Sequence, residues 1–248
     1  MKIIRYLHAS SISYGILDGE TVREIHGGLF DGLEETSRKL NFGDVTLLCP
    51  CEPSKVLAIG LNYRSHLGDR SEPKEPAVFY IPTSALLKPE GTIQIPADAE
   101  DVHYEGELVA IIGTELRNAT TEEAADGIFG FTCGNDISER TWQKNDLQWW
   151  RAKGCDTFAP LGPVITTDFD WFRGGIRTLL NGAVVQEGRF SELLFDPPGI
   201  IRYISQYVTL YPGDVIYTGT PGKTRALKSG DRIEVQIDEI GSLMNNVT

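Results

Sequence analysis

The chain has 248 residues, of which 41% are hydrophobic and 23% are charged, as expected for a globular protein with a sizeable core. Its formal net charge of -12 argues against binding to nucleic-acid phosphates or to an anionic membrane surface. An anionic substrate is not excluded, because a bound metal ion can reverse the sign of the charge inside a pocket.

The sequence carries no targeting signal that we can identify. Its N-terminal stretch lacks the apolar run and cleavage site of a signal peptide, and no uncharged apolar stretch approaches the roughly 20 residues of a membrane helix. We therefore expect a cytoplasmic protein without a membrane partner. No second close cysteine pair completes a zinc site, so we expect reduced thiols at Cys49, Cys51, Cys133 and Cys155.

The first fifty residues read as short strands followed by one helix-like segment. "KIIRYLHA", "ISYGILDG" and "TVREIHG" have the pattern of a small antiparallel sheet, and "GLEETSRKL" (32–40) looks helical. The two prolines of "CPCEPSK" then mark a boundary. We predict a small N-terminal β subdomain at 1–53 and a second domain at 54–248.

In the second part, strands are many and helices are few. Helices are predicted at 121–129, which a threonine cap opens, and at 197–208, where Pro198 suits the first turn. Asn181-Gly182 indicates a hairpin. The pattern favours a β-rich α+β fold over a doubly wound sheet. The predicted strands are 55–60, 77–81, 107–113, 161–166, 178–187, 214–218 and 231–237.

Two glutamates interrupt a strand-like segment, "VHYEGELVAIIG". Glu105 and Glu107 are two residues apart, so on a strand they project from the same face with backbone positions about 6.5 Å apart. The pair is consistent with a solvent-facing strand end, with two catalytic carboxylates of split pKa, or with ligands of a hard divalent cation.

A third acid favours the metal interpretation. Asp136 ends the apolar strand-like run "GIFGFTCGND", and three carboxylates leave open positions on Mg²⁺ or Mn²⁺ for water and substrate. His103 lies on the same strand face as Glu105, where it either supports a ligand or is structural.

A histidine and an acid follow the buried strand at 55–60. In "GLNYRSHLGD", His66 and Asp69 are three residues apart and face each other if the loop forms a helical turn. The acid would then orient the imidazole as a base for water activation. An exposed pair is the alternative.

Six motifs in this order resemble the fumarylacetoacetate hydrolase superfamily over about residues 55–248. They are "VLAIGLNYRSH", "HYEGELVAIIG", "GFTCGNDISERTWQ", "RAKGCDTFAPLGP", "TLYPGDVIYTGTP" and "LKSGDRIEVQIDEIGSL". The sequence is most similar to the bacterial branch of acylpyruvate hydrolases, oxaloacetate decarboxylases and homoprotocatechuate-pathway isomerase/decarboxylases.

The resemblance implies a β-roll or barrel-like core, a homodimer and a divalent metal, Mg²⁺ or Mn²⁺, with Ca²⁺ as a possible occupant in crystals. It implies a loop that closes over the site and carries His66 and Asp69. The implied metal ligands are Glu105, Glu107 and Asp136. The implied groups around the substrate are Arg140, Gln143, Lys153, Thr157 and Thr220.

Some positions depart from the superfamily pattern. Asp69 is one methylene shorter than the glutamate that many members carry, and Ile81 replaces a frequent lysine. Gly154-Cys155 stands where Ser-Phe is common, and the usual threonine at 190 is missing. These departures concern the substrate pocket and leave the three acids and Lys153 in place.

The implied chemistry is cleavage or rearrangement of C–C bonds in a small 2-oxo mono- or dicarboxylate. A cation that binds the keto and carboxylate oxygens stabilises the enolate that forms. With water activated by His66 and Asp69, the expected reaction is hydrolysis of an acylpyruvate to pyruvate. Decarboxylation or isomerisation of oxaloacetate or of a homoprotocatechuate intermediate is the alternative. A metal- or metabolite-binding protein without activity is the alternative of another class.

Overall fold

The protein is mostly β-sheet, in a computed structural model that describes all 248 residues. It has nineteen strands and five short α-helices. The predicted β-rich α+β class is confirmed, although the sheets do not close into a barrel. No helix is long and apolar enough to cross a membrane.

The N-terminal half contains most of the strands. They are β1 (Lys2–His8), β2 (Ser11–Asp18), β3 (Thr21–Ile25), β4 (Glu35–Asn41), β5 (Thr46–Leu47), β6 (Val56–Gly60), β7 (Ala77–Ile81), β8 (Leu86–Leu87), β9 (Thr92–Ile93), β10 (Val102–His103) and β11 (Gly106–Ile112). The remaining strands are β12 (Ile128–Asn135), β13 (Ser138–Glu139), β14 (Ala159–Thr166), β15 (Gly175–Leu180), β16 (Ala183–Arg189), β17 (Val215–Tyr217), β18 (Arg232–Ile237) and β19 (Gly241–Val247).

The helices connect these strands. The α-helices are α1 (Arg64–Leu67), α2 (Thr121–Asp126), α3 (Arg140–Asn145), α4 (Trp150–Gly154) and α5 (Pro197–Ser205). Four 3₁₀ turns are η1 (Phe42–Asp44), η2 (Thr83–Ala85), η3 (Trp171–Arg173) and η4 (Phe190–Glu192).

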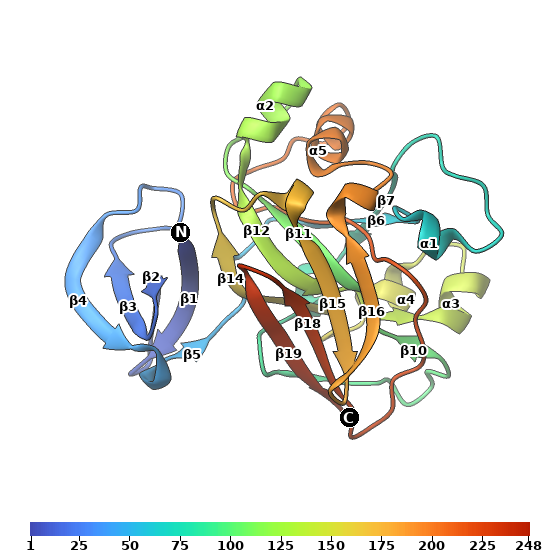
Figure 1. Cartoon of the computed structure of the whole chain (residues 1–248), viewed down its shortest axis with the longest axis horizontal. Coiled ribbons are helices and arrows are strands. Elements are labelled where there is room, and N and C mark those ends of the chain that lie inside the picture. Colours follow the sequence, from blue (N-terminus) through green and yellow to red (C-terminus); the bar gives the residue numbers. More distant parts are fainter.

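One twelve-stranded sheet runs through the whole molecule. Its main path is β4-β3-β2-β1-β14-β12-β11-β17-β6-β7, so β4 and β7 are its two edges. A five-stranded sheet, β16-β15-β18-β19-β9, packs against β11, β12 and β14, as Figure 1 shows. Strands β15 and β16 are the predicted hairpin at Asn181-Gly182, so 178–187 is two strands and not one.

The N-terminal strands stand to one side of the larger body (Figure 1). Strand β1 joins the two parts, because it pairs with β2 along one edge and places Lys2 and Ile3 opposite Thr166 and Ile165 of β14 along the other. The domain boundary between residues 53 and 54 stays a prediction.

The helix predicted at 32–40 is wrong, because residues 35–41 form strand β4. Leu40 of β4 lies opposite Val22 of β3, and the guanidinium of Arg23 is 2.6 Å from the carboxylate of Glu35. Leu33 and Leu40 are seven residues apart, a spacing that suits one face of a helix, whereas in the structure Leu33 precedes β4. Cross-strand pairing, which the local pattern does not contain, decides the outcome.

Strand β11 lies at the centre of the fold and is buried throughout its length. Leu108 and Ala110 on one face pack into a cluster that includes residues of α5, while Val109 and Ile111 on the other face pack against Tyr217 and its neighbours. Because side chains alternate along a strand, Val109 and Ile111 share their face with the two glutamates that precede them. Glu105 and Glu107 therefore lie on the same strand face as side chains of the hydrophobic core.

Candidate metal centre

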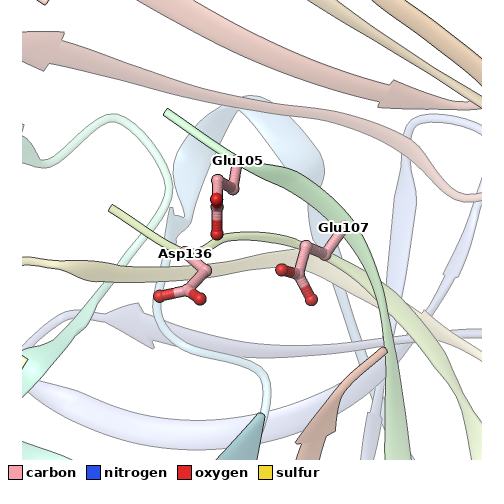
Figure 2. A group of neighbouring side chains, drawn as sticks. All are labelled: Glu105, Glu107 and Asp136. Atoms are coloured by element: carbon pink, nitrogen blue, oxygen red, sulfur yellow. The ribbon is translucent and has the colours of Figure 1, made fainter. Parts of the chain in front are cut away.

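Three carboxylates converge where β11 begins and β12 ends. Gly106 pairs with Asn135, which places Glu105 and Glu107 next to Asp136, the residue that follows β12. Figure 2 shows the three side chains pointing toward a common space. One oxygen of each lies within 4.8 Å of the others. All three residues are at most 5% exposed, so the solvent-facing interpretation is wrong.

Backbone contacts fix the glutamates at this position. The side chain of Asn135 accepts a hydrogen bond from the Glu105 amide at 2.9 Å. Glu107 accepts one from the amide of Gly219 at 2.6 Å. The acids are thus held by β12 and by the loop after β17.

Two cations partly balance the acids. Lys153 of α4, which is 2% exposed, donates to Glu105 at 2.6 Å and also to Asp136. Arg140 of α3 donates to the other oxygen of Glu105 at 2.6 Å. The second oxygen of Asp136 is buried without any hydrogen-bond partner.

The charges shift the pKa values of the acids in different directions. Burial acts to raise the pKa of Glu105, but Lys153 and Arg140 outweigh it and hold that pKa well below its usual range. Burial and the charges of Asp136 and Glu105 raise the pKa of Glu107 well above its usual range. Burial, opposed by Lys153 and reinforced by Glu105, raises the pKa of Asp136 to about 7. Lys153 and Arg140 therefore do not fully neutralise the three acids.

The residues present fit a divalent cation. Three oxygen donors of hard type face one space, one donor oxygen has no partner, and two of the acids hold protons abnormally strongly without a cation. Mg²⁺ and Mn²⁺ prefer such oxygen ligands. The geometry thus supports the predicted ligand set of Glu105, Glu107 and Asp136.

His66 lies at the site, whereas Asp69 does not pair with it. The Nδ1 atom of His66 is 2.7 Å from the carbonyl oxygen of Gly222, and Nε2 is 3.4 Å from Glu105. Helix α1 ends at Leu67, and Gly68 has φ of 60°, which turns the chain out of the helix before Asp69. Asp69 is exposed, so the predicted dyad is not formed in this structure.

Arg140 belongs to a hydrogen-bonded group at the entrance of the site. It donates to the side chain of Gln143 at 2.8 Å and to the hydroxyl of Thr224 at 3.0 Å. The side chain of Glu139 caps α3 and accepts from the amide of Asp101 at 2.8 Å, which fixes the start of the helix. Arg140 and Gln143 therefore lie together at the site, and their predicted contact with the substrate stays a prediction.

Thr220 and Thr157 have different surroundings. The hydroxyl of Thr220 donates to the carbonyl of Gly106 at 2.8 Å and accepts from Gln186 at 2.9 Å, beside the glutamates. The hydroxyl of Thr157 instead accepts from the amide of Gln94 at 2.9 Å. Thr157 does not line the cavity described next, so the structure does not bring it to the site.

Sequence reasoning missed a second histidine–acid pair. His103 is 2.8 Å from Asp101 through Nε2 and 2.8 Å from the hydroxyl of Thr224 through Nδ1. Asp101 lies two residues before His103, a spacing that was available in the sequence. Nothing in the loop sequence around Thr224 indicated that it would meet them.

Glu105 and Glu107 open into a cavity of about 870 Å³. Glu105, Glu107 and Lys153 line its inner part, together with His66 and Arg140. Phe79 and Trp149, whose rings are 5.2 Å apart, form an aromatic wall beside Lys153. This volume accommodates a small organic substrate.

Comparison with known proteins identifies the family. A family model described as "Fumarylacetoacetate (FAA) hydrolase C-terminal" matches residues 55–248. The chain belongs to the fumarylacetoacetate hydrolase family. A second model, "Rv2993c-like, N-terminal", matches residues 1–50.

Relatives in this family carry names of different activities. A 5-carboxymethyl-2-hydroxymuconate delta-isomerase from Mycobacterium smegmatis is 40% identical with a TM-score of 0.95, covering 100% of this chain and 99% of its own. A mitochondrial oxaloacetate tautomerase from Xenopus laevis is 37% identical over 87% of this chain and 72% of its own length. A fumarylacetoacetate hydrolase from Exiguobacterium antarcticum is 31% identical with a TM-score of 0.91, covering 100% of this chain and 99% of its own. The family is thus shown, whereas its members differ in reaction.

Proposed function

We propose that the protein is a Mg²⁺- or Mn²⁺-dependent enzyme that moves a proton within a 2-oxo carboxylate. Its reaction would interconvert keto and enol forms or shift a double bond. The observation that carries this proposal is the buried cluster of three carboxylates with Lys153 beside it. A buried, incompletely neutralised cluster of this kind is costly unless it has a use.

The metal would be held by Glu105, Glu107 and Asp136. When bound, it would withdraw electrons from the keto group and stabilise the enolate. Lys153 and Arg140 both contact Glu105 and would place positive charge near the carboxylate and enolate oxygens of the substrate. The aromatic wall of Phe79 and Trp149 would offer an apolar surface to the carbon chain of the substrate.

His66 is the group that we assign to the proton transfer. A carbonyl oxygen only accepts hydrogen bonds, so Nδ1 of His66 must donate its proton to Gly222. This leaves Nε2, which faces the cavity near Glu105, as the atom that takes or gives a proton. The loop contact with Gly222 thus fixes both the tautomer and the orientation.

Two observations favour proton transfer over hydrolysis. The acid expected to orient His66 for water activation, Asp69, is exposed and makes no contact with it. The relatives named as isomerase and tautomerase are 40% and 37% identical, against 31% for the fumarylacetoacetate hydrolase from Exiguobacterium antarcticum. Acylpyruvate hydrolysis remains the second candidate, because His66 lines the cavity at the acids.

A substrate panel tests the proposal. Oxaloacetate, acetylpyruvate and fumarylpyruvate are each incubated with Mg²⁺, with Mn²⁺ and with EDTA. We expect metal-dependent enol–keto interconversion of oxaloacetate without pyruvate release. Pyruvate release from acetylpyruvate or fumarylpyruvate at a higher rate would favour the hydrolase instead. Undiminished activity in EDTA would refute the metal role, and no turnover of any substrate would favour the non-catalytic binder. Light scattering separately tests the proposed homodimer.

A further inference from the structure

A closed circuit of hydrogen bonds holds Arg140 at both of its ends. The backbone amide of Arg140 donates to the carbonyl of Asp101 at 2.9 Å. The carboxylate of Asp101 is 2.8 Å from Nε2 of His103, and Nδ1 of His103 is 2.8 Å from the hydroxyl of Thr224. That hydroxyl in turn lies 3.0 Å from Nη2 of Arg140. The circuit therefore begins and ends on the same arginine.

The chemistry of each group sets the direction of these bonds. A carboxylate oxygen only accepts hydrogen bonds, so Nε2 of His103 must donate to Asp101. A neutral imidazole carries one N–H, which leaves Nδ1 to accept from the hydroxyl of Thr224. The oxygen of this hydroxyl then accepts from Arg140, whose guanidinium has only donors. Each donor in the circuit meets an acceptor when His103 is the Nε2–H tautomer.

The bonds to Arg140 fix the plane of its guanidinium. Nη2 donates to Glu105 at 2.6 Å and to Thr224 at 3.0 Å, so both of its N–H groups are used. Nη1 donates to Gln143 at 2.8 Å. A guanidinium is planar, so bonds from two of its nitrogens orient the whole group. The second N–H of Nη1 is left for an external oxygen, and Arg140 lines the cavity.

Among the three acceptors, only Thr224 ties the guanidinium to another part of the chain without being a candidate metal ligand. Glu105 would share its oxygens with a bound cation. Gln143 lies on the same short helix as Arg140 and moves with it. Thr224 comes from the loop after β17, so its hydroxyl fixes the arginine relative to the rest of the cavity wall.

The loop after β17 also holds Glu107 and His66. The amide of Gly219 donates to Glu107 at 2.6 Å, and the carbonyl of Gly222 accepts from Nδ1 of His66 at 2.7 Å. One loop thus contacts an acid of the cluster, the group that we assign to proton transfer and, through Thr224, the guanidinium at the cavity.

We propose that Asp101, His103 and Thr224 are positioning residues that hold the guanidinium of Arg140 ready for the carboxylate of the substrate. Their loss should weaken the binding of an anion at the acid cluster, although none of the three needs to touch it. This inference rests on the proposed function for the contact between Arg140 and the substrate. The circuit itself depends on neither a bound metal nor a substrate.

The tautomer of His103 tests the direction of the circuit. The chain has four histidines, so labelling with nitrogen-15 histidine gives few resonances, and His103→Gln assigns the one in question. In EDTA at about pH 8, above the ordinary histidine pKa of about 6.5, we expect Nε2–H for His103 and Nδ1–H for His66. Thr224→Val should move the Nδ1 resonance of His103, whereas Thr224→Ser should not. An Nδ1–H tautomer of His103 would overturn the circuit.

Oxalate binding tests the effect on Arg140. Oxalate is a small dianion whose oxygens resemble those of a 2-oxo carboxylate, and its affinity for the Mn²⁺-saturated full chain is measured by calorimetry. Thr224→Val removes the hydroxyl with little change in side-chain shape. We expect about five- to twenty-fold weaker binding, as for loss of a hydrogen bond to a charged group. Thr224→Ser keeps the hydroxyl and should restore most of the affinity.

A double-mutant cycle shows whether the hydroxyl acts through the arginine. In the Arg140→Gln protein, Thr224→Val should cause no further loss of oxalate affinity, because the group that Thr224 positions is already gone. A loss of the same size in both backgrounds would overturn the positioning role. Unchanged affinity in the Thr224→Val protein with Arg140 present would overturn it as well.

These measurements also separate the inference from the proposed function. Oxalate binding that requires Mn²⁺ but is insensitive to Thr224→Val would overturn the inference and leave the metal-dependent function standing. Absence of oxalate binding to the unsubstituted chain with Mn²⁺ would overturn the proposed function and the substrate contact of Arg140 together. The tautomer of His103, measured in EDTA, decides the circuit in either case.

Discussion

Replacement of Glu107 by glutamine gives the sharpest test of the metal centre. Glu107 is 1% exposed, and its carboxylate accepts a hydrogen bond from the Gly219 amide. A glutamine side chain has nearly the same shape and keeps an oxygen that accepts this bond. The substitution therefore removes one unit of charge with little change in packing.

The expected magnitudes differ between the metal-free and metal-loaded states. Two unit charges 4.8 Å apart interact by about 3.5 kcal/mol at an effective dielectric constant of about 20. Loss of one ligand charge should weaken Mn²⁺ binding by at least about a hundred-fold, since about 1.4 kcal/mol corresponds to a factor of ten. In the metal-free protein the pKa of Glu107 is already raised by burial and by Asp136 and Glu105. A neutral side chain there should change the Tm by no more than about 3 °C.

Calorimetric Mn²⁺ titration and thermal unfolding, each with and without EDTA, measure these two quantities. Turnover of oxaloacetate should disappear together with Mn²⁺ binding. Glu115→Gln, an exposed acid just after β11, is the matched control and should behave as the unsubstituted protein. Unchanged Mn²⁺ affinity in Glu107→Gln would refute the assignment of this ligand. Loss of affinity together with a large fall of the metal-free Tm would show that the acid is structural.

Four further predictions concern single groups or segments. Lys153→Gln should lower the Tm in EDTA more than in Mn²⁺, because it leaves buried acids without a counter-charge; equal losses in both conditions would contradict this. The pKa of Asp136 is raised to about 7 from an ordinary 3.8. Protonation of Asp136 therefore contributes stability below pH 3.8, and this stability is lost as the pH rises through 7. The Tm gain from Mn²⁺ should consequently be larger at about pH 8 than at about pH 6. His66→Ala should slow enol–keto exchange at least about a hundred-fold with Mn²⁺ affinity retained, and unchanged exchange would exclude Nε2 as the proton carrier. A chain that starts at Lys55 should unfold at a lower temperature because Ile165 loses its contact with Ile3, and full stability and activity would show that the N-terminal strands do not help to cover the core.

The acid cluster was predictable because each part of it had a local sequence signal. The i, i+2 spacing of Glu105 and Glu107 fixes a common strand face, and the apolar run before Asp136 marks the end of another strand. The pairing of Gly106 with Asn135 then follows from two adjacent antiparallel strands. Strand periodicity thus carries most of the information about the metal centre.

The entrance of the cavity was less predictable because it is built from loops. The position of Asp69 depends on a single backbone turn at Gly68, which the His-x-x-Asp spacing does not contain. The contacts of His103 and Arg140 with Thr224 join residues separated by more than eighty positions. Long-range contacts of this kind leave no periodic pattern, so a sequence shows the side chains but not their partners.

The charges around the candidate metal centre would allow an acidic protein to receive the anionic substrate that we propose. Counted as ionised, the three carboxylates and the two paired cations, Lys153 and Arg140, carry one net negative charge, and the raised pKa of Glu107 shows that the metal-free cluster relieves this charge by holding a proton. A divalent cation changes this local balance from one negative to one positive charge. A bound cation would therefore strengthen the attraction of an anionic substrate to the acids. Mn²⁺ should therefore raise the affinity for oxalate, and oxalate should raise the affinity for Mn²⁺ by the same factor.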